Sequence, residues 1–345
     1  MSDSPVPTLE AIAQTAGVSR MTVSRVLRNV RHINPATRER VLQAVQQTGY
    51  RPNPMVSAFM SYVRRGGAGK GTDVMAYLTS GVSRHKWREE VNYLRFHEGA
   101  VARAQQRGYR LEEFWLGDRS MSVRRLSDIL YKRGIHGVVT APMTSSHAHL
   151  RLEWPRFSAS AIGFSLLKPF LHRATNDQYN SMLIALRELR RLGYRRVGLA
   201  MPRVDDERVH YHWSAAYLSF YQRWNGRKAP ALYLPTVWDA RGFLAWNRQH
   251  RPDVIVSTRP TPLEWLQEVG YLVPEDIGYA NLDWAPTLAS CAGIDQRPQT
   301  VGAAAVDLVV EQINHNEFGL SSHPRVVTLS GEWVPGPTVR TPLAS

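Results

Sequence analysis

Apolar residues recur at helical spacing near the start of this 345-residue chain. Leu9, Ile12 and Ala13 share one face of a first predicted helix. Gly17 provides the permissive backbone that a tight corner needs. A second helix is predicted over residues 20–27, with its valines on one face and polar residues on the other. Two short helices joined in this way form the arrangement that places one helix in the major groove of DNA.

The polar face of the second helix carries the candidate DNA contacts. Arg20 and Arg25 can each donate a forked pair of hydrogen bonds to guanine, and Met21 can touch a thymine methyl group. Thr22 and Ser24 suit contacts that position a protein on the phosphate backbone. The alternative is a small helical bundle whose basic face is merely solvated.

Two further helix starts and the charge distribution favour the DNA-binding interpretation. Asn34-Pro35 predicts a third helix that ends near Thr48, with Gly49 as its stop. Asn53-Pro54 repeats the signal and opens a short helix from Met55 to about Val63. Residues 1–65 hold nine Lys and Arg against three Asp and Glu, a net +6, whereas the other 280 residues carry only +8. This concentration of positive charge fits phosphate binding.

From about Asp73, short apolar runs alternate with helical patterns. Strands are predicted over 74–79, 109–115, 137–140, 159–163, 196–200, 231–234, 254–257 and 277–282. Helices are predicted between them over 93–106, 123–131, 179–192, 213–224, 240–248 and 262–269. This alternation predicts parallel sheets with helices on both faces. The length favours two lobes with a cleft between them, and a ligand is expected at the carboxyl ends of the strands.

The motifs of the first region resemble the LacI family of bacterial transcription regulators. The resemblance rests on AGVSRMTVSRVL and NPATRERVLQAVQQTGYRPNP, and more weakly on FHEGAVARAQQRGYRL, ELRRLGYRRVGLA, VPEDIGYANLD and VVTLSGEWVPGPTVR. It implies an all-α helix-turn-helix DNA-binding head plus an α/β periplasmic-binding-protein-like effector domain of two doubly wound lobes. We expect the head over residues 1–53, a hinge helix and linker over 54–72, and the effector and dimerisation domain over 73–345.

The resemblance also implies a set of DNA contacts and a partner. A homodimer would bind double-stranded operator DNA, with the hinge helix wedging the minor groove. Phe59 stands where the family usually has the wedging leucine, so it is expected either to wedge or to pack in the dimer. The predicted DNA-binding residues are Thr8, Ser19, Arg20, Met21, Thr22, Ser24, Arg25, Arg28, Asn29, Tyr50, Arg51, Asn53 and Phe59.

A small-molecule effector of the carbohydrate class is implied for the cleft. Asp283 corresponds to the family's hydroxyl-binding aspartate, although a strand-end aspartate can instead cap a helix. Trp213 stands where the family often has an effector-binding arginine, and Arg259-Pro260 replaces an Asn-Asp pair. Arg259 is therefore a candidate partner for an anionic sugar. The predicted effector-binding residues are Ser80, Trp87, His212, Trp213, Trp238, Arg259, Asp283 and Trp284, although any one tryptophan is more often a core residue.

The remaining features indicate a regulator rather than an enzyme. The single cysteine, Cys291, excludes a disulfide framework and fits the cytoplasm, where we expect a nucleoid-associated protein. No export or membrane-spanning segment is evident, and the glycine-rich residues 64–72 fail the spacing of a phosphate-binding loop. His147 with His149 is too sparse for a metal site, and the acids at 205–207 are expected on a loop, facing water. We therefore expect no cofactor, metal or catalytic residue.

Two other functions remain open from the sequence. One is a corepressor-dependent regulator, in which the ligand strengthens DNA binding. The other is a sugar-acting enzyme attached to a DNA-binding head, which would need a paired acid and base or a metal site. The leading prediction is a repressor whose operator affinity is gated by its effector.

Overall fold

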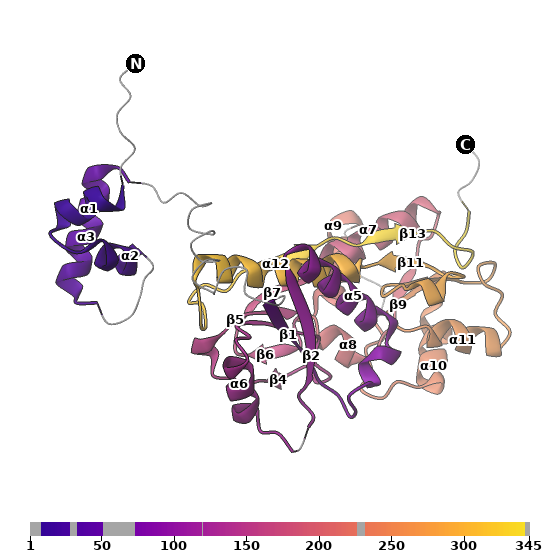
Figure 1. Cartoon of the computed structure of the whole chain (residues 1–345). Helices are drawn as coiled ribbons and strands as arrows, with labels where there is room; N and C mark the ends of the chain where they lie inside the picture. The colour runs from indigo at the N-terminus through magenta and orange to yellow at the C-terminus, as the bar shows by residue number, and fades with distance from the viewer. Residues whose placement is uncertain (1–7, 28–32, 51–72, 119, 226–231, 342–345) are drawn as a thin grey trace. The chain divides into compact units, whose positions relative to one another are not determined.

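A computed structural model of the chain describes residues 8–27, 33–50, 73–118, 120–225 and 232–341 (Figure 1). The helical head comprises α1 (Leu9–Ala16), α2 (Arg20–Leu27) and α3 (Pro35–Thr48). Its core is built from the predicted apolar faces, since Ile12, Val23 and Val41 are fully buried. The predicted hinge helix, from Met55 to about Val63, lies outside the described residues.

The ends of the head helices follow from local chemistry. Thr8 Oγ1 accepts the amide hydrogen of Ala11, Ser19 Oγ that of Thr22, and Asn34 Oδ1 that of Ala36, at 3.3, 3.1 and 2.9 Å. Such caps satisfy amides that have no partner within the helix. Gly17 and Gly49 end α1 and α3 in the left-handed conformation. The helix start at Asn34, the corner at Gly17 and the stop at Gly49 that the sequence predicts are confirmed.

The first lobe of the α/β core is a six-stranded, fully parallel sheet in the order β12-β7-β5-β3-β1-β2. Its helix α6 (Val123–Lys132) covers one face, and α5 (Val91–Gln106) and α12 (Pro298–His315) cover the other (Figure 1). A small pair, β4 (Ala148–His149) and β6 (Leu166–Lys168), adds to this lobe. The strands are β1 (Asp73–Thr79), β2 (Tyr109–Trp115), β3 (Gly137–Thr140), β5 (Ser158–Ile162), β7 (His172–Asn176) and β12 (Val326–Leu329).

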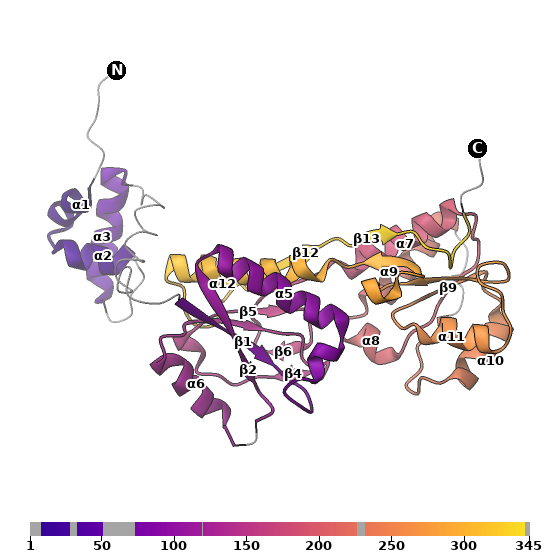
Figure 2. The same ribbon diagram turned by 45° about the vertical axis from the view of Figure 1, so that its right-hand side comes forward.

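The second lobe is a five-stranded sheet in the order β13-β11-β10-β9-β8, in which only β13 is antiparallel to its neighbour. The helices α7 (Gln178–Arg191) and α9 (His212–Asn225) pack on one face, and α10 (Ala240–His250) and α11 (Thr261–Glu268) on the other (Figure 2). The short α8 (Arg203–Glu207) follows β8. The strands are β8 (Val197–Leu199), β9 (Val254–Ser257), β10 (Gly278–Asn281), β11 (Ala292–Asp295) and β13 (Glu332–Val334).

Cys291 lies in the aromatic-rich core beneath α10 and α11. Its side chain is almost completely buried, and burial raises the pKa of the thiol. We assign this cysteine a packing role.

The chain crosses between the lobes three times, after β7, after β11 and after β12. The crossing segments are hydrogen-bonded to one another: Asp177 N donates to Leu329 O at 2.8 Å, and Asn176 Nδ2 donates to Gln296 O at 2.5 Å. Gly331 N also donates to Ser181 Oγ at 3.3 Å. The connection between the lobes is therefore a bonded bundle of three segments rather than a single linker.

Helices α5 and α12 cross with their backbones in direct contact. A Cβ atom placed on Gly302 would overlap the carbonyl oxygen of Phe96, and one placed on Gly99 would overlap the backbone of Gln299. Ser160 Oγ donates to Ala305 O at 2.7 Å and fixes α12 against β5. Glycine is needed at this crossing for lack of space, not for an unusual backbone conformation.

The predicted α/β alternation is confirmed, with most ends within two residues, but some elements were misjudged. The strand predicted over 231–234 is wrong, because the part described makes only one bridge, between Tyr233 and Ala200. Pro235 follows and has no amide hydrogen to extend the ladder. The elements β7, β11, β12, β13 and α12 were not predicted from the sequence.

Candidate functional site

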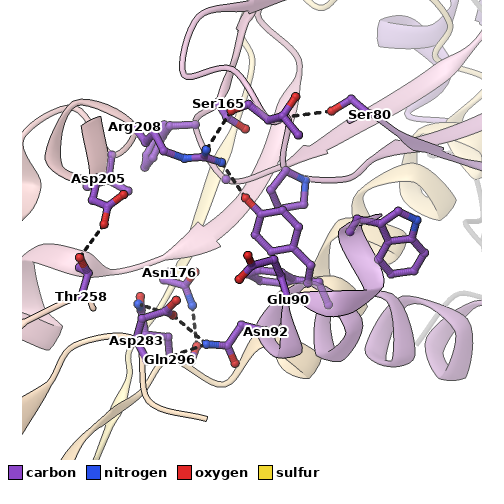
Figure 3. A pocket seen from close by; sticks show the side chains of 18 of the residues that line it. Ser80, Glu90, Asn92, Ser165, Asn176, Asp205, Arg208, Thr258, Asp283 and Gln296 are labelled. Atoms are coloured by element: carbon purple, nitrogen blue, oxygen red, sulfur yellow. Dashed lines mark hydrogen bonds between the residues drawn. The ribbon is translucent and has the colours of Figure 1, made fainter. Parts of the chain in front are cut away.

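A cavity of about 390 Å³ lies between the two lobes of the core. It opens at the carboxyl ends of the strands, since Ser80 follows β1, Thr258 follows β9 and Asp283 follows β10 (Figure 3). This is where an open α/β sheet binds its ligand, and the size suits a small organic molecule. The other polar side chains in the lining are Lys86, Glu90, Asn92, Thr144, Ser165, Asn176, Gln178, Asp205, Arg208, Arg259 and Gln296.

Asp283 is held facing this space by a local turn. Its amide donates to Asn281 Oδ1 at 2.7 Å, and its Oδ1 accepts from Asn92 Nδ2 at 2.9 Å and Gln296 Nε2 at 3.2 Å. Figure 3 shows Asn92 and Asp283 pointing toward each other with Gln296 beside them. Protein atoms around the carboxylate displace water from it and raise the pKa of Asp283 to about 6, although part of the residue is exposed; the charge of Asp205 adds to the effect. Hydrogen-bond donors on a ligand would stabilise the ionised form.

The Asn92–Asp283 hydrogen bond joins the lobes, because Asn92 lies on α5. Arg95, one turn further along α5, donates from Nη1 to Asn92 Oδ1 at 3.0 Å and orients its amide. Nη2 of the same guanidinium donates to both carboxylate oxygens of Asp295, at 3.0 and 2.7 Å, and its Nε donates to Gln299. A continuous polar chain therefore runs from the end of β11 through α5 to the carboxylate in the cavity.

Arg208 makes a second connection across the cleft. It follows α8 in the second lobe, and its Nη2 donates to the hydroxyl of Tyr93 and the carbonyl of Met143, both at 2.8 Å. Its Nη1 donates to Thr144 O at 3.1 Å. All three acceptors belong to the first lobe. Arg208 was not predicted from the sequence, because the arginine of the family was expected at the position of Trp213, five residues later.

The recognition face of the head is exposed as predicted for α2. Arg20, Met21 and Arg25 point to solvent, and the side chain of Met21 is 63% exposed. Ser19 Oγ and Thr22 Oγ1 are 2.9 Å apart, which orders the start of the helix. Thr8 is exposed, Ser24 is half-buried, and Tyr50 packs against the head core. The predicted contacts Arg28, Asn29, Arg51, Asn53 and Phe59 lie outside the described residues.

The head and part of the core each match a model of a known protein family. The family model for bacterial regulatory proteins of the lacI family matches residues 8–53, and the model for a periplasmic binding protein-like domain matches residues 186–339. The head therefore resembles that of lacI-family regulators, and a large part of the core resembles a periplasmic binding protein-like domain.

Curated relatives match this chain over the head. The sucrose operon repressor of Shigella flexneri is 56% identical over 45 residues, which are 13% of this chain and 14% of the relative. The transcriptional regulator CelR of Thermobifida fusca is 53% identical over 47 residues, 14% of each chain. These alignments thus span only about a seventh of the relatives' own length.

Solved structures share the fold over nearly the whole chain. A complex of the regulator CelR with cellobiose superposes with a TM-score of 0.55 at 21% identity, covering 96% of this chain and 99% of the other. The lac repressor dimer bound to operator and the anti-inducer ONPF gives a TM-score of 0.54 at 18% identity, covering 98% and 100%. The predicted fold class, a helix-turn-helix head with a two-lobed periplasmic-binding-protein-like domain, is confirmed.

The arginine in the cavity wall is already paired. Arg259 Nε and Nη2 donate to the two carboxylate oxygens of Asp205, each at 2.7 Å, and Thr258 Oγ1 donates to the same group at 2.7 Å. The guanidinium charge is thus compensated within the wall. This arrangement weakens the sequence hypothesis that Arg259 binds an anionic sugar.

The prediction that the acids at 205–207 face water on a loop is wrong. They form part of α8, Asp205 has only 10% of its side chain exposed, and Asp206 is fully buried. Asp206 Oδ1 accepts the amide hydrogen of Ser214 at 3.2 Å and so caps the start of α9. Burial raises the pKa of Asp206. The helix corner, which local sequence does not reveal, turns these carboxylates inward.

Aromatic side chains line part of the cavity. Trp87 lies in the short helix η1 (Lys86–Glu89), where its Nε1 donates to Glu113 Oε1 at 3.1 Å and the guanidinium of Arg88 lies 4.4 Å from its ring centre. Trp213 contributes to the wall although only 2% of it is exposed, because most of its ring lies in the core of the second lobe. Tyr93, Phe96 and Phe164 also line the cavity and were not predicted from the sequence.

Three residues of the predicted effector set do not contribute to the cavity lining. The ring of His212 contacts the edge of Phe164, 5.4 Å between centres. Trp238 donates to Thr261 Oγ1 at 2.9 Å and packs on Trp265 in the core. Trp284 Nε1 donates to Cys291 O at 3.1 Å. Ser80, Trp87, Trp213, Arg259 and Asp283 are the predicted residues that the cavity brings together.

The part of the chain that the structure describes contains no helix long and apolar enough to cross a membrane.

The raised pKa of Asp283 has a measurable consequence for stability. An aspartate has a pKa of about 3.9 in an unfolded chain, so between about pH 4 and pH 6 the folded state binds more protons than the unfolded state. The free energy of unfolding therefore falls as the pH rises through this window. Asp283→Asn removes this loss of stability. The melting temperature of the variant minus that of the wild type should therefore increase from pH 4 to pH 7. A difference that does not change with pH would contradict the assignment.

Proposed function

We propose that this protein is a sequence-specific, DNA-binding transcription regulator, a repressor, whose operator affinity is gated by a small uncharged carbohydrate in the cleft. The observation that carries the proposal is the presence in one chain of two sites. The head presents the exposed arginines of α2 on the face suited to a major groove. The core presents Asp283 in a cavity whose contacts come from both lobes.

Three observations support a carbohydrate as the effector. The carboxylate of Asp283 suits ligand hydroxyl groups, which donate hydrogen bonds, and the indole of Trp87 lines the same cavity. Arg259 is already neutralised by Asp205, so an uncharged ligand fits the wall better than an anion. Relatives carry names that refer to sucrose, and a structural neighbour was solved with cellobiose.

The contacts between the lobes supply a route for gating. A ligand that takes the oxygens of Asp283 competes with Asn92, whose hydrogen bond crosses the cleft. The ligand therefore favours whichever lobe arrangement offers it the better set of donors and acceptors. If the arrangement of the lobes affects the head, ligand binding must change the affinity of the protein for DNA.

We propose that the functional unit is a cytoplasmic homodimer. Two copies of α2 are needed to meet two half-sites of a pseudo-palindromic operator. The predicted effector contacts of His212, Trp238 and Trp284 are not part of this proposal, because these residues do not line the cavity.

The DNA part of the proposal is tested by selecting duplexes from a random pool and measuring their affinity. Arg20→Ala should weaken binding to the selected duplex by about ten- to a hundredfold, because one forked contact to guanine is worth about 1–3 kcal/mol. Arg40→Ala, which removes the same charge from an exposed position on α3, should have a much smaller effect. Equal losses in the two variants would show that α2 does not read bases.

The gating part is tested by a thermal-shift screen over neutral sugars and their charged analogues. A sugar that raises the melting temperature should also change the affinity for the selected duplex at fixed salt. A loss of DNA affinity identifies an inducer, and a gain identifies a corepressor. Binding without any change in DNA affinity would rule out gating by that ligand.

A further inference from the structure

Exposed arginines gather at the end of the second lobe that lies away from the cavity. Arg195 and Arg196 directly precede β8, and Arg251 ends α10 three residues before β9. These are the amino ends of the strands, whereas the cavity lies at the carboxyl ends. We call this surface the arginine pole; its members are Arg191, Arg195, Arg196, Arg248, Arg251 and Arg340, all exposed.

The backbone that presents the pole is fixed by hydrogen bonds. Asp253 accepts the amide hydrogens of Arg195 and Arg196, through its Oδ2 and Oδ1, at 2.8 and 2.9 Å. Arg340 donates its amide hydrogen to the Tyr194 hydroxyl at 2.9 Å, and its guanidinium lies 4.5 Å from the centre of that ring. Two segments therefore present these arginines: Arg195 and Arg196 are fixed by Asp253, and Arg340 is fixed at Tyr194.

The charges of the pole are largely uncompensated. Arg191 pairs with Glu188 at 3.0 Å, but the other five members form no ion pair with any residue that the structure describes. In the first lobe, by contrast, several arginines have acidic partners: Asp307 binds Arg107, Glu112 binds Arg133, and Asp128 binds Arg156.

Acidic residues at the same end of the lobe do not cancel this charge. Glu275 and Asp276 precede β10, which is separated from β8 by β9. Asp276 also accepts the amide hydrogen of Leu272 at 2.8 Å. The β8 side of the pole therefore keeps a local positive excess.

We propose that the arginine pole binds the phosphates of a DNA duplex, as a second, sequence-independent contact separate from the head. Guanidinium groups match phosphate oxygens with paired hydrogen bonds. This role of the pole rests on the proposed function, because it assumes that the head holds the chain on DNA. A chain held on DNA by its head meets neighbouring duplex at high effective concentration, so that a weak phosphate-binding surface is sufficient.

The test uses the full chain carrying Arg20→Ala and Arg25→Ala, so that base contacts of the head do not dominate. The probe is a labelled duplex of random sequence, titrated over a series of salt concentrations. In this background, Arg195→Gln/Arg196→Gln removes two charges from the pole and keeps the backbone hydrogen bonds to Asp253. The matched control is Arg124→Gln/Arg125→Gln, an adjacent pair of exposed arginines at the start of α6 in the first lobe, neither in an ion pair with a described residue.

We expect the pole variant to bind the duplex several-fold more weakly at low salt than the control. The slope of log affinity against log salt should become shallower by about 0.9 for each phosphate that the variant no longer neutralises, hence by up to about 1.8. Melting temperatures equal to those of the parent show that both variants are folded.

Three results would overturn the proposal. Equal weakening by pole and control substitutions would mean that net charge alone is responsible, and no weakening would mean that the pole does not touch DNA. If binding of labelled polyglutamate depends on Arg195 and Arg196 while duplex binding does not, the pole recognises an acidic polypeptide instead. Failure of Arg20→Ala to weaken a selected duplex would overturn the proposed regulator but leave the result for the pole intact.

Discussion

Gly302→Ala should lower the midpoint of thermal unfolding by roughly 5–10 °C, although alanine favours a helix by about 1 kcal/mol over glycine. The added methyl group would overlap the carbonyl oxygen of Phe96 where α5 and α12 cross. Backbone cannot rotate away as a side chain can, so the helices must separate and the packing of both against the sheet loosens. Forcing extra volume into a packed core typically costs about 1–3 kcal/mol, and more where backbone must move.

Ala303→Gly on the next position of α12 is the matched control. It makes the reverse change in helix propensity and should cost only about 1 kcal/mol. Differential scanning calorimetry of the two variants and the parent separates the effects. A Gly302→Ala protein as stable as the parent would show that the helices are not in backbone contact.

Arg95→Ala should cost about 3–5 kcal/mol in urea unfolding, because it leaves the carboxylate of Asp295 without its partner in a mostly buried site. The side chains of this pair are 10% and 20% exposed. Arg103→Ala on the same helix breaks a pair with Asp307 whose side chains are 35% and 36% exposed, and it should cost less than about 1 kcal/mol. Both variants truncate an arginine on α5, so the difference in cost measures the buried ion pair together with the hydrogen bonds from Arg95 to Asn92 and Gln299.

The double variant Arg95→Ala/Asp295→Ala sharpens this second test. Removing the unpaired carboxylate as well should restore part of the lost stability. The two single variants and the double variant form a double-mutant cycle, whose coupling energy measures the interaction between Arg95 and Asp295. Arg95→Ala also frees the amide of Asn92, so any sugar found to bind at Asp283 should bind with altered affinity. Equal costs for Arg95→Ala and Arg103→Ala would disprove the special role of the buried pair.

The head was predictable because its determinants are local. Thr8, Ser19 and Asn34 each bond to an amide two or three residues away, and Gly17 and Gly49 adopt the conformation that their lack of a side chain favours. The parallel strands of the core were likewise visible as short apolar runs. β7 was not, because its sequence HRATN is mostly polar although all five residues are buried.

The candidate site was only partly predictable, since its geometry depends on residues far apart in the chain. Asp283 follows a recognisable strand, but its partner Asn92 is 191 residues away in the sequence. Trp87 and Trp238 were both predicted to bind the effector, yet of the two only Trp87 lines the cavity. Whether an indole faces a cavity or a core depends on how neighbouring elements pack, and one residue's surroundings in the sequence do not contain that information.

The burial of Cys291 makes the chain a ready background for site-specific labelling. The chain has no other cysteine, and this thiol is shielded beneath α10 and α11. One reactive thiol introduced on the outer face of α6 and another on the outer face of α10 would therefore take up a pair of dyes with little competition from the native residue. Energy transfer between the dyes then reports the separation of the lobes in solution, on the same preparation that is titrated with sugar or with duplex.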